Sequence, residues 1–204
     1  MASTVNQLWD LPAPTVSGPH SLERSLAERR SVREYGSVML TRSQLGQLLW
    51  AAQGITERTG LRTAPSAGAL YPLELYVVAG DVVDLPPGVY HYQVGSHALA
   101  LGAAGDRRAD VGAAALGQEW VGLAPAIIVI AAVYGRTTAN YGERGRRYVH
   151  MEVGHAAQNV CLQATALGLA SVVIGAFSDR DIKRLSGRPP REEPLALLPV
   201  GRPA

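Results

Sequence analysis

Three arginines and a serine fall within five consecutive residues of the segment RRSVREY, which covers residues 29–35. In an extended turn, Arg29, Ser31 and Arg33 can point the same way, because side chains alternate along extended backbone. Guanidinium groups bind phosphate through charge-assisted and often bidentate hydrogen bonds, and the hydroxyl adds a further donor. The spacing therefore allows a phosphate site at this turn, although it equally suits a solvated basic loop.

A run of small residues precedes a hydrophobic strand in the segment TAPSAGALYPLELYVV, residues 63–78. From Ala64 to Ala69 the chain is almost bare backbone, whereas Leu73 to Val78 is typical of a buried strand. One interpretation is a loop that passes close to another element. The other is that a flat aromatic ligand rests on this backbone, with Ser66 and peptide N–H groups bonding its polar rim.

Two histidines in the segment HMEVGHAAQN, residues 150–159, raise the question of a metal site. His150 and His155 lie about 140° apart around a helix, whereas metal-binding histidines on a helix are four residues apart. No metal is therefore predicted. His155, Gln158 and Asn159 are instead expected to be buried and hydrogen-bonded, and Cys161 to be an inert core residue.

Several kinds of site are missing from the sequence. It contains no Gly-x-Ser-x-Gly motif, no Walker loop and no glycine-rich turn with the dinucleotide pattern. Nicotinamide binding in a Rossmann crevice is therefore not expected. The net charge of +2 is mild, and no lysine or arginine block is interleaved with aromatic residues, so no nucleic-acid partner is expected.

The composition suits one domain with a substantial core. The chain has 204 residues, of which 47% are hydrophobic and only 18% are charged. The low charge content indicates a partner surface, formed by a second copy of the chain. The longest apolar run, residues 124–134, is too short to span a bilayer, and no signal peptide is evident. A cytoplasmic protein without a membrane partner is expected.

Helices and strands must hold these segments in place. Residues 1–20 show no clear period and are expected to form an extended arm, followed by a single domain over residues 21–204.

Thr41 is expected to cap a helix, with Gln44 as its capping-box partner and Gly54 at its end. The other expected helices cover residues 21–28, 107–122, 148–167 and 179–185. The expected strands cover residues 73–79, 88–93, 97–101, 126–134, 171–177 and 195–200. Because the order lacks a strict βαβ rhythm, the fold class is α+β.

Taken in order, these segments resemble the flavin-dependent nitroreductase superfamily, and within it the SagB-type dehydrogenases of the azoline-oxidase branch. The resemblance covers roughly residues 25–203 and runs through ERRSVREYG, LTRSQLGQLLWAAQGIT, TAPSAGALYPLELYVV, RRYVHMEVGHAAQNVCLQATALGL, VVIGAF and LLPVGRP. It implies a central, mainly antiparallel sheet flanked by helices, in an intertwined homodimer with FMN at the subunit interface. The flavin would carry the chemistry, and the protein would supply binding, orientation and charge.

The resemblance also implies which residues hold FMN. One group would grip its phosphate and ribityl chain: Arg29, Arg30, Ser31, Arg33 and, from the C-terminal strand, Arg202. A second group would reach the flavin of the other subunit: Pro65, Ser66, Ala67 and Gly68. A third would present backbone to the reactive edge of the ring: Ile174 and Gly175.

Azoline oxidases use a Lys-Tyr pair to remove a proton while the flavin takes hydride, and here the corresponding residues are Arg147 and Tyr148. Arginine stays charged and is a poor base, so catalysis would depend on Tyr148 with its pKa lowered by a neighbouring cation. Alternatively, Tyr148 is an aromatic residue packed at the start of a helix. This departure from the family pattern favours a small-molecule substrate over a peptide azoline.

The function implied is that of an FMN-dependent oxidoreductase. It would move two electrons between flavin and a small-molecule or modified-peptide substrate by a ping-pong cycle, with NAD(P)H as a candidate electron donor. The direction of the reaction stays open. Two alternatives remain: a flavin-binding partner subunit with little turnover alone, and an azoline dehydrogenase in the maturation of peptide natural products.

Overall fold

The structure, a computed structural model, describes residues 7–186 and 191–204. Its strands are β1 (Leu8–Asp10), β2 (Leu73–Ala79), β3 (Gly88–Gln93), β4 (Ala98–Ala104), β5 (Ala126–Ala132), β6 (Ala170–Ser171) and β7 (Glu193–Gly201). Its α-helices are α1 (Leu22–Glu28), α2 (Arg42–Gln53), α3 (Arg108–Ala114), α4 (Tyr134–Tyr141), α5 (Arg144–Ala166) and α6 (Asp179–Ser186). Its 3-10 helices are η1 (Ala67–Ala69) and η2 (Glu119–Leu123).

A single antiparallel sheet organises the part of the chain that the structure describes. Its seven strands follow the order β1-β4-β3-β2-β5-β7-β6, and every neighbouring pair is antiparallel. At the centre, β2 pairs with β5 from Leu73 opposite Ala132 to Ala79 opposite Ala126. The α+β class and the mainly antiparallel sheet expected from the sequence are confirmed.

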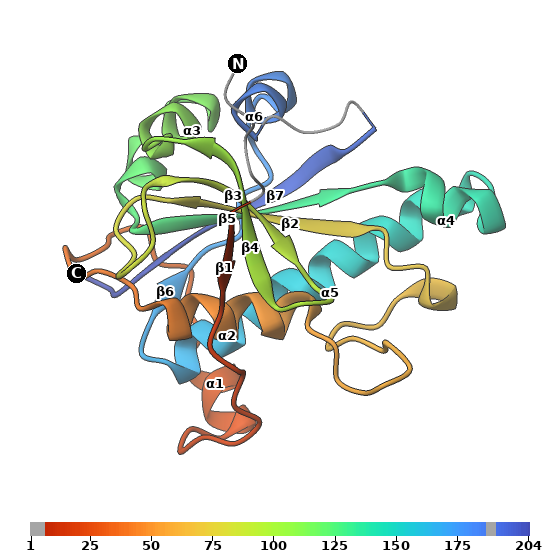
Figure 1. Cartoon of the computed structure of the whole chain (residues 1–204), viewed down its shortest axis with the longest axis horizontal. Coiled ribbons are helices and arrows are strands. Elements are labelled where there is room, and N and C mark those ends of the chain that lie inside the picture. The colour runs from red at the N-terminus through yellow and green to blue at the C-terminus, as the bar shows by residue number, and fades with distance from the viewer. Residues whose placement is uncertain (1–6, 187–190) are drawn as a thin grey trace.

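The central strand β5 is buried along its whole length, because helices cover both faces of the sheet. Figure 1 shows α2 and α5 below the sheet and α3 and α6 above it. Ile128 and Ile130 belong to the core cluster on the α2 and α5 side, whereas Ile127 and Val129 belong to the cluster on the α3 and α6 side. Since neighbouring side chains of a strand point to opposite faces, a strand covered on both sides must be apolar throughout.

Most of the expected helices are confirmed. The capping box at the start of α2 is present: the N–H of Gln44 donates to Oγ1 of Thr41 at 3.1 Å, and the N–H of Thr41 donates to Oε1 of Gln44 at 3.0 Å. One continuous helix over residues 107–122 is wrong. The chain forms α3 and η2 instead, because Leu116 and Gly117 adopt left-handed backbone with φ of 57° and 75° and end the first helix.

The long helix α5 begins at Arg144, earlier than the expected start at Tyr148. The short helix α4 before it was not expected, since residues 134–141 lack an apolar stripe at helical spacing. The strand expected over residues 126–134 ends at Ala132, because Tyr134 already begins α4. Over the described ranges, no helix combines the length and apolar character needed to cross a membrane.

Candidate functional site

The basic turn lies beside β6 at one edge of the sheet. Ser31 forms a parallel bridge with Ser171, and the N–H of Val32 donates to the Ser171 carbonyl at 3.3 Å. The C-terminal segment joins them, because the N–H of Gly36 donates to the carbonyl of Arg202 at 3.0 Å. The structure therefore brings together the two ends of the chain from which phosphate-binding arginines were expected.

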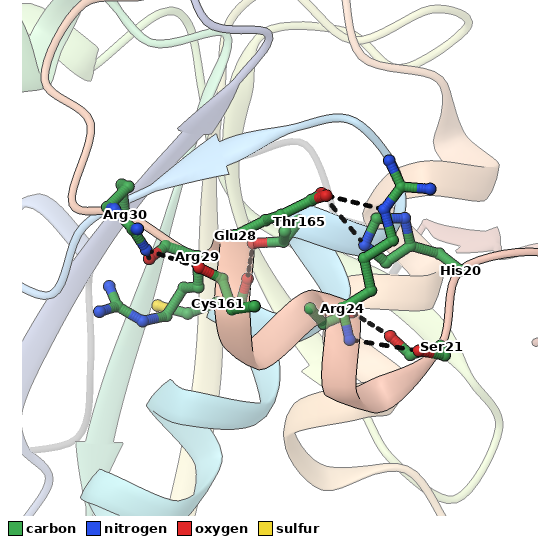
Figure 2. A network of polar contacts seen from close by, with 10 residues as sticks. His20, Ser21, Arg24, Glu28, Arg29, Arg30, Cys161 and Thr165 are labelled. Atoms are coloured by element: carbon green, nitrogen blue, oxygen red, sulfur yellow. Dashed lines mark hydrogen bonds and ion pairs between the residues drawn. The ribbon is translucent and has the colours of Figure 1, made fainter.

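The arginines at this edge have no carboxylate within ion-pair distance among the described residues. Arg29 is half-buried beside the thiol of Cys161, as Figure 2 shows. Arg33 is exposed, with its guanidinium carbon 5.8 Å from the ring centroid of Trp120. Cys161 and Trp120 belong to core layers on opposite faces of the sheet, so these two cations flank the sheet edge. Arg202 is exposed and also has no ion-pair partner among the described residues. Such groups suit an external anion.

Arg30 is held differently from its neighbours. Its Nη1 donates to the carbonyl of Ala27 at 2.9 Å and to the carbonyl of Arg29 at 2.7 Å (Figure 2). These contacts tie the side chain to the C-terminal end of α1, where unpaired carbonyl groups attract a cation. Only Nε and Nη2 of Arg30 remain for a ligand.

A buried hydroxyl accompanies these cations. Oγ of Ser171 is buried without a hydrogen-bond partner in the residues described, although it lies near the thiol of Cys161. Burial raises the pKa of the Cys161 thiol, while Arg29 and Ser171 oppose this shift. Because protein atoms cover this hydroxyl, Ser171 and Cys161 form a buried pair beside Arg29 and do not offer the Ser171 side chain to an external ligand.

The two residues expected at the reactive edge of a flavin follow β6. Ile174 is buried and exchanges two main-chain hydrogen bonds of 2.9 Å with Leu197 on β7. Gly175 is exposed, and no heavy atom lies within 4 Å of the position that a Cβ would take. Backbone at Gly175 is therefore open to a ligand, whereas Ile174 is fixed by the sheet.

The small-residue segment is tied to α5 by a buried carboxylate. The N–H of Ala67 donates to Oε1 of Glu152 at 3.0 Å, and the Glu152 side chain is only 3% exposed. Burial raises the pKa of Glu152, although the Ala67 N–H and the Ser66 hydroxyl oppose the shift. Pro65 and Gly68 are exposed, and Ser66 and Ala67 are half-buried. The segment is thus anchored to α5 through Ala67 and exposed to solvent at Pro65 and Gly68.

The backbone at the end of this segment is strained. Ala69 and Tyr71 have φ of 51° and 44°, which costs about 1–3 kcal/mol for each non-glycine residue. Tyr71 is held there because its N–H donates to Oγ of Ser66 at 2.9 Å and its carbonyl accepts from Arg136 at 2.9 Å. Its hydroxyl also accepts from the N–H of Arg62 at 3.2 Å. Strain that several contacts enforce is typical of functional segments.

Two of the polar residues expected to be buried on α5 are exposed. His155 and Gln158 face outward, and only Asn159 makes the expected contact, donating to the carbonyl of Ala51 at 3.0 Å. The buried polar residue of this helix is Glu152, which the sequence analysis missed. Its spacing, three residues after Val149 and four before Ala156, was the available indication that Glu152 lies on the buried face of the helix. No cluster of three or more potential metal ligands occurs in residues 7–186 and 191–204.

Tyr148 lies in the second turn of α5, close to the small-residue segment. It is half-buried, and its ring meets that of Tyr141 edge to face, with centroids 5.2 Å apart and an interplanar angle of 84°. The hydroxyl of Tyr141 is 2.9 Å from the position that a Cβ on Gly68 would take. Arg147 is exposed and makes no ion pair with a described residue. Tyr148 and Gly68 are therefore linked through Tyr141.

The expected site residues form two groups within one chain. Figure 1 shows the C-terminus on the left and the segment before β2 on the right, with α5 running between them. Glu152 contacts one group and Cys161 the other, and these residues are about 14 Å apart along the helix. The two groups therefore lie at different positions along α5.

A cavity of about 460 Å³ lies elsewhere, between the N-terminal arm, α2 and α5. Trp50 and Leu162 line it, and the arm is fixed there because the N–H of Thr15 donates to Oε1 of Gln47 at 2.8 Å. None of the residues expected to bind FMN lines this cavity, so its size alone does not make it the candidate site.

The model of the nitroreductase family matches residues 26–202 of the chain. The chain belongs to the nitroreductase family. A relative from Methanocaldococcus jannaschii, provisionally named a nitroreductase, is 50% identical over 181 residues, which are 89% of this chain and 90% of that protein. The family assignment confirms the superfamily that the sequence resembles and leaves the branch within it open.

Solved structures of this nitroreductase fold extend the comparison. A protein of Ralstonia eutropha JMP134, also provisionally named a nitroreductase, is 30% identical with a TM-score of 0.86, over 100% of this chain and 92% of that chain. A chain of the E. coli microcin synthetase complex, solved with its truncated pro-peptide bound, is 25% identical with a TM-score of 0.74, over 95% of this chain and 77% of that chain. The NADPH:FMN oxidoreductase of Vibrio harveyi shares the fold. It is 20% identical with a TM-score of 0.65, over 89% of this chain and 68% of that chain.

Proposed function

We propose that this nitroreductase-family chain is an FMN-dependent oxidoreductase that acts as a homodimer and moves two electrons to or from an organic substrate. The observation that carries the proposal is the sheet edge where the basic turn pairs with β6 and with the C-terminal segment, which brings Arg29, Arg33 and Arg202 to one edge without carboxylate partners among the described residues. A phosphate dianion would satisfy these groups, because it accepts several charge-assisted hydrogen bonds. Ser31 and the free nitrogens of Arg30 would bind the same phosphate or the ribityl chain.

A bound flavin would supply hydride and electron-pair transfer. The residues of this chain would bind and orient it. The open backbone at Gly175, with the fixed Ile174 before it, would lie along the reactive edge. Arginine side chains and peptide N–H groups would stabilise negative charge on the reduced ring, an effect of the oxyanion-hole type.

The exposed outer side of the small-residue segment supports a homodimer. In a symmetric dimer, the segment of one subunit would complete the site of its partner. The anchored and strained backbone of this segment, open on its outer side at Gly68, suits contact with a flat ring.

Arg147 and Tyr148 are proposed to face the substrate. Through Tyr141, Tyr148 lies next to the segment that would contact the partner's flavin. Its hydroxyl would donate or accept the substrate proton, and the exposed guanidinium of Arg147 would stabilise the phenolate or an anionic substrate group.

A second function is favoured by the microcin synthetase neighbour, which works in a complex on a peptide. In that case the chain would be a flavin-binding subunit, or an azoline dehydrogenase, that needs a partner for turnover. The chain alone would then bind FMN and show little activity with small acceptors.

The deciding experiment is steady-state kinetics of the FMN-loaded protein with NADH or NADPH and a quinone or nitroaromatic acceptor. The proposal expects turnover with parallel lines in double-reciprocal plots, the pattern of a ping-pong cycle. Tight FMN binding without turnover for any donor would support the partner-subunit function instead.

A further inference from the structure

A polar cleft of about 470 Å³ lies where β2 begins and β3 ends. It is separate from the basic turn beside β6. Its charged and polar lining comes from Arg62, Glu74, His91, Gln93 and Arg136. None of these residues belongs to the groups expected to bind FMN. The cleft therefore needs an explanation of its own.

The single carboxylate of the cleft is already occupied on both oxygens. Oε1 of Glu74 accepts from Nη2 of Arg136, and Oε2 lies 2.7 Å from Nε2 of His91. The other ring nitrogen of His91 lies 2.9 Å from Nε2 of Gln93. Burial opposes ionisation, but the contacts with His91 and Arg136 outweigh it and hold the pKa of Glu74 below its usual value. Glu74 is thus charged, and each of its oxygens already has a partner within the cleft.

Arg62 is the second arginine, and it has no carboxylate partner among the described residues. Its Nη1 donates to the amide oxygen of Gln53 at 2.9 Å, and its guanidinium lies over the Tyr71 ring with 4.3 Å from Cζ to the ring centroid. No hydrogen bond to its Nε or Nη2 forms within the residues described. Burial lowers the pKa of Arg62, the charge of Glu74 opposes this shift, and the nearby charge of Arg136 adds to it. Arg62 is therefore a half-buried cation near a carboxylate that Arg136 and His91 already contact.

We propose that this cleft binds an oxyanion, the carboxylate or phosphate group of a small ligand, with Arg62 as its principal partner. Two guanidinium groups and one carboxylate leave the cleft with a surplus positive charge, which an anion would neutralise. The free Nε and Nη2 form one edge of the guanidinium, and that edge matches the two oxygens of a carboxylate or phosphate. Stacking on Tyr71 keeps the edge oriented before a ligand arrives.

The cleft also adjoins the small-residue segment. Arg136 and Arg62 both hold Tyr71, and Tyr71 in turn donates to Ser66. An anion between the arginines would strengthen the contacts that keep Tyr71 in its left-handed conformation. The binding site itself depends on neither FMN nor the proposed redox activity.

The test is isothermal titration calorimetry of the purified protein in a buffer without phosphate or carboxylate, with sodium acetate and inorganic phosphate titrated separately. Sodium chloride at matched ionic strength measures the non-specific effect of salt. Saturable binding of one or both anions is expected, and the stronger one identifies the ligand class. If neither anion binds beyond the chloride baseline, the proposal is overturned.

Two variants connect the binding to Arg62. Arg62→Gln is expected to weaken binding about tenfold or more, the equivalent of one lost hydrogen-bonded charge. Arg58→Gln removes an exposed arginine from the same loop and is expected to bind like the wild type. Equal loss in both variants would show a general charge effect and would contradict the site. Arg62→Lys keeps the charge without the bidentate edge, so weakened but saturable binding is expected even if the glutamine variant does not fold.

Discussion

The carboxylate of Glu152 accepts the main-chain N–H of Ala67 at 3.0 Å, and this bond joins the central helix to the small-residue segment. Glu152 is buried, yet the segment that it holds is open on its outer side at Pro65 and Gly68. The segment is therefore positioned by the core of its own chain while its outer side stays available. A loop that contacts a neighbouring subunit's ligand needs this arrangement.

Glu152→Ala is expected to lower the free energy of unfolding by about 1–3 kcal/mol, because it leaves the N–H of Ala67 without an acceptor. Glu152→Gln keeps an acceptor oxygen and is the matched control. Urea unfolding measures both variants. Equal stability of the alanine variant and the wild type would show that the bond does not hold the segment.

The same residue predicts a pH dependence. The pKa of Glu152 is raised above 4.5 in the folded protein, so the folded state binds more protons than the unfolded state between the two values. The free energy of unfolding of the wild type should therefore fall relative to Glu152→Gln as the pH rises from below 4.5 through the raised pKa. His155 and Arg62 also affect this carboxyl, and both are unchanged in the control. A constant difference between the two proteins across this range would contradict the assignment.

Gly68→Ala is expected to destabilise the segment for two reasons. The φ of 62° costs a residue with a Cβ about 1 kcal/mol, and that Cβ would lie 2.9 Å from the hydroxyl of Tyr141. Adding Tyr141→Phe removes the close contact and leaves only the backbone cost, so the double variant should regain part of the lost stability. Thermal unfolding of both variants provides the test, and an alanine variant as stable as the wild type would refute the strain.

Cys161 is expected to be unreactive in the folded protein. Burial raises the pKa of its thiol, so little thiolate forms at neutral pH. A thiol reagent should modify the native protein slowly and the protein in guanidinium chloride rapidly. Fast modification of the native protein would show that Arg29 activates the thiol instead.

The sequence predicted the elements whose residues follow a regular pattern. The strand at residues 73–79, the capping box of Thr41 and Gln44, and the apolar β5 all depend on local periodicity or capping chemistry. Backbone φ is not visible in composition, so the break at Leu116 and Gly117 was missed. Helix α4 was missed because its residues have no apolar stripe.

The candidate site was predictable only in part. The arginines at residues 29–33 and 202 were proposed because charge is evident in the sequence, and their role in binding FMN stays a prediction. The contact between Ser31 and Ser171 depends on the pairing of β6 with β7, which no local pattern encodes. Glu152 was overlooked because a charged residue in a helix is normally solvated, and only the fold shows that it meets Ala67.

Arg29→Ala and Arg202→Ala are each expected to weaken FMN binding about tenfold or more, since each removes charge-assisted hydrogen bonds to the phosphate. Arg24→Ala is the control, because Arg24 is exposed on α1 and pairs with Glu28. Flavin fluorescence during equilibrium dialysis measures the affinity. If both test variants bind FMN as the control does, the phosphate assignment is wrong.

The most direct measurement of the central claim is the visible spectrum of the purified protein before and after incubation with FMN and gel filtration. We predict a yellow protein that retains one FMN per subunit and shows the visible absorbance bands of protein-bound flavin. A colourless protein that takes up no FMN would contradict the proposed function.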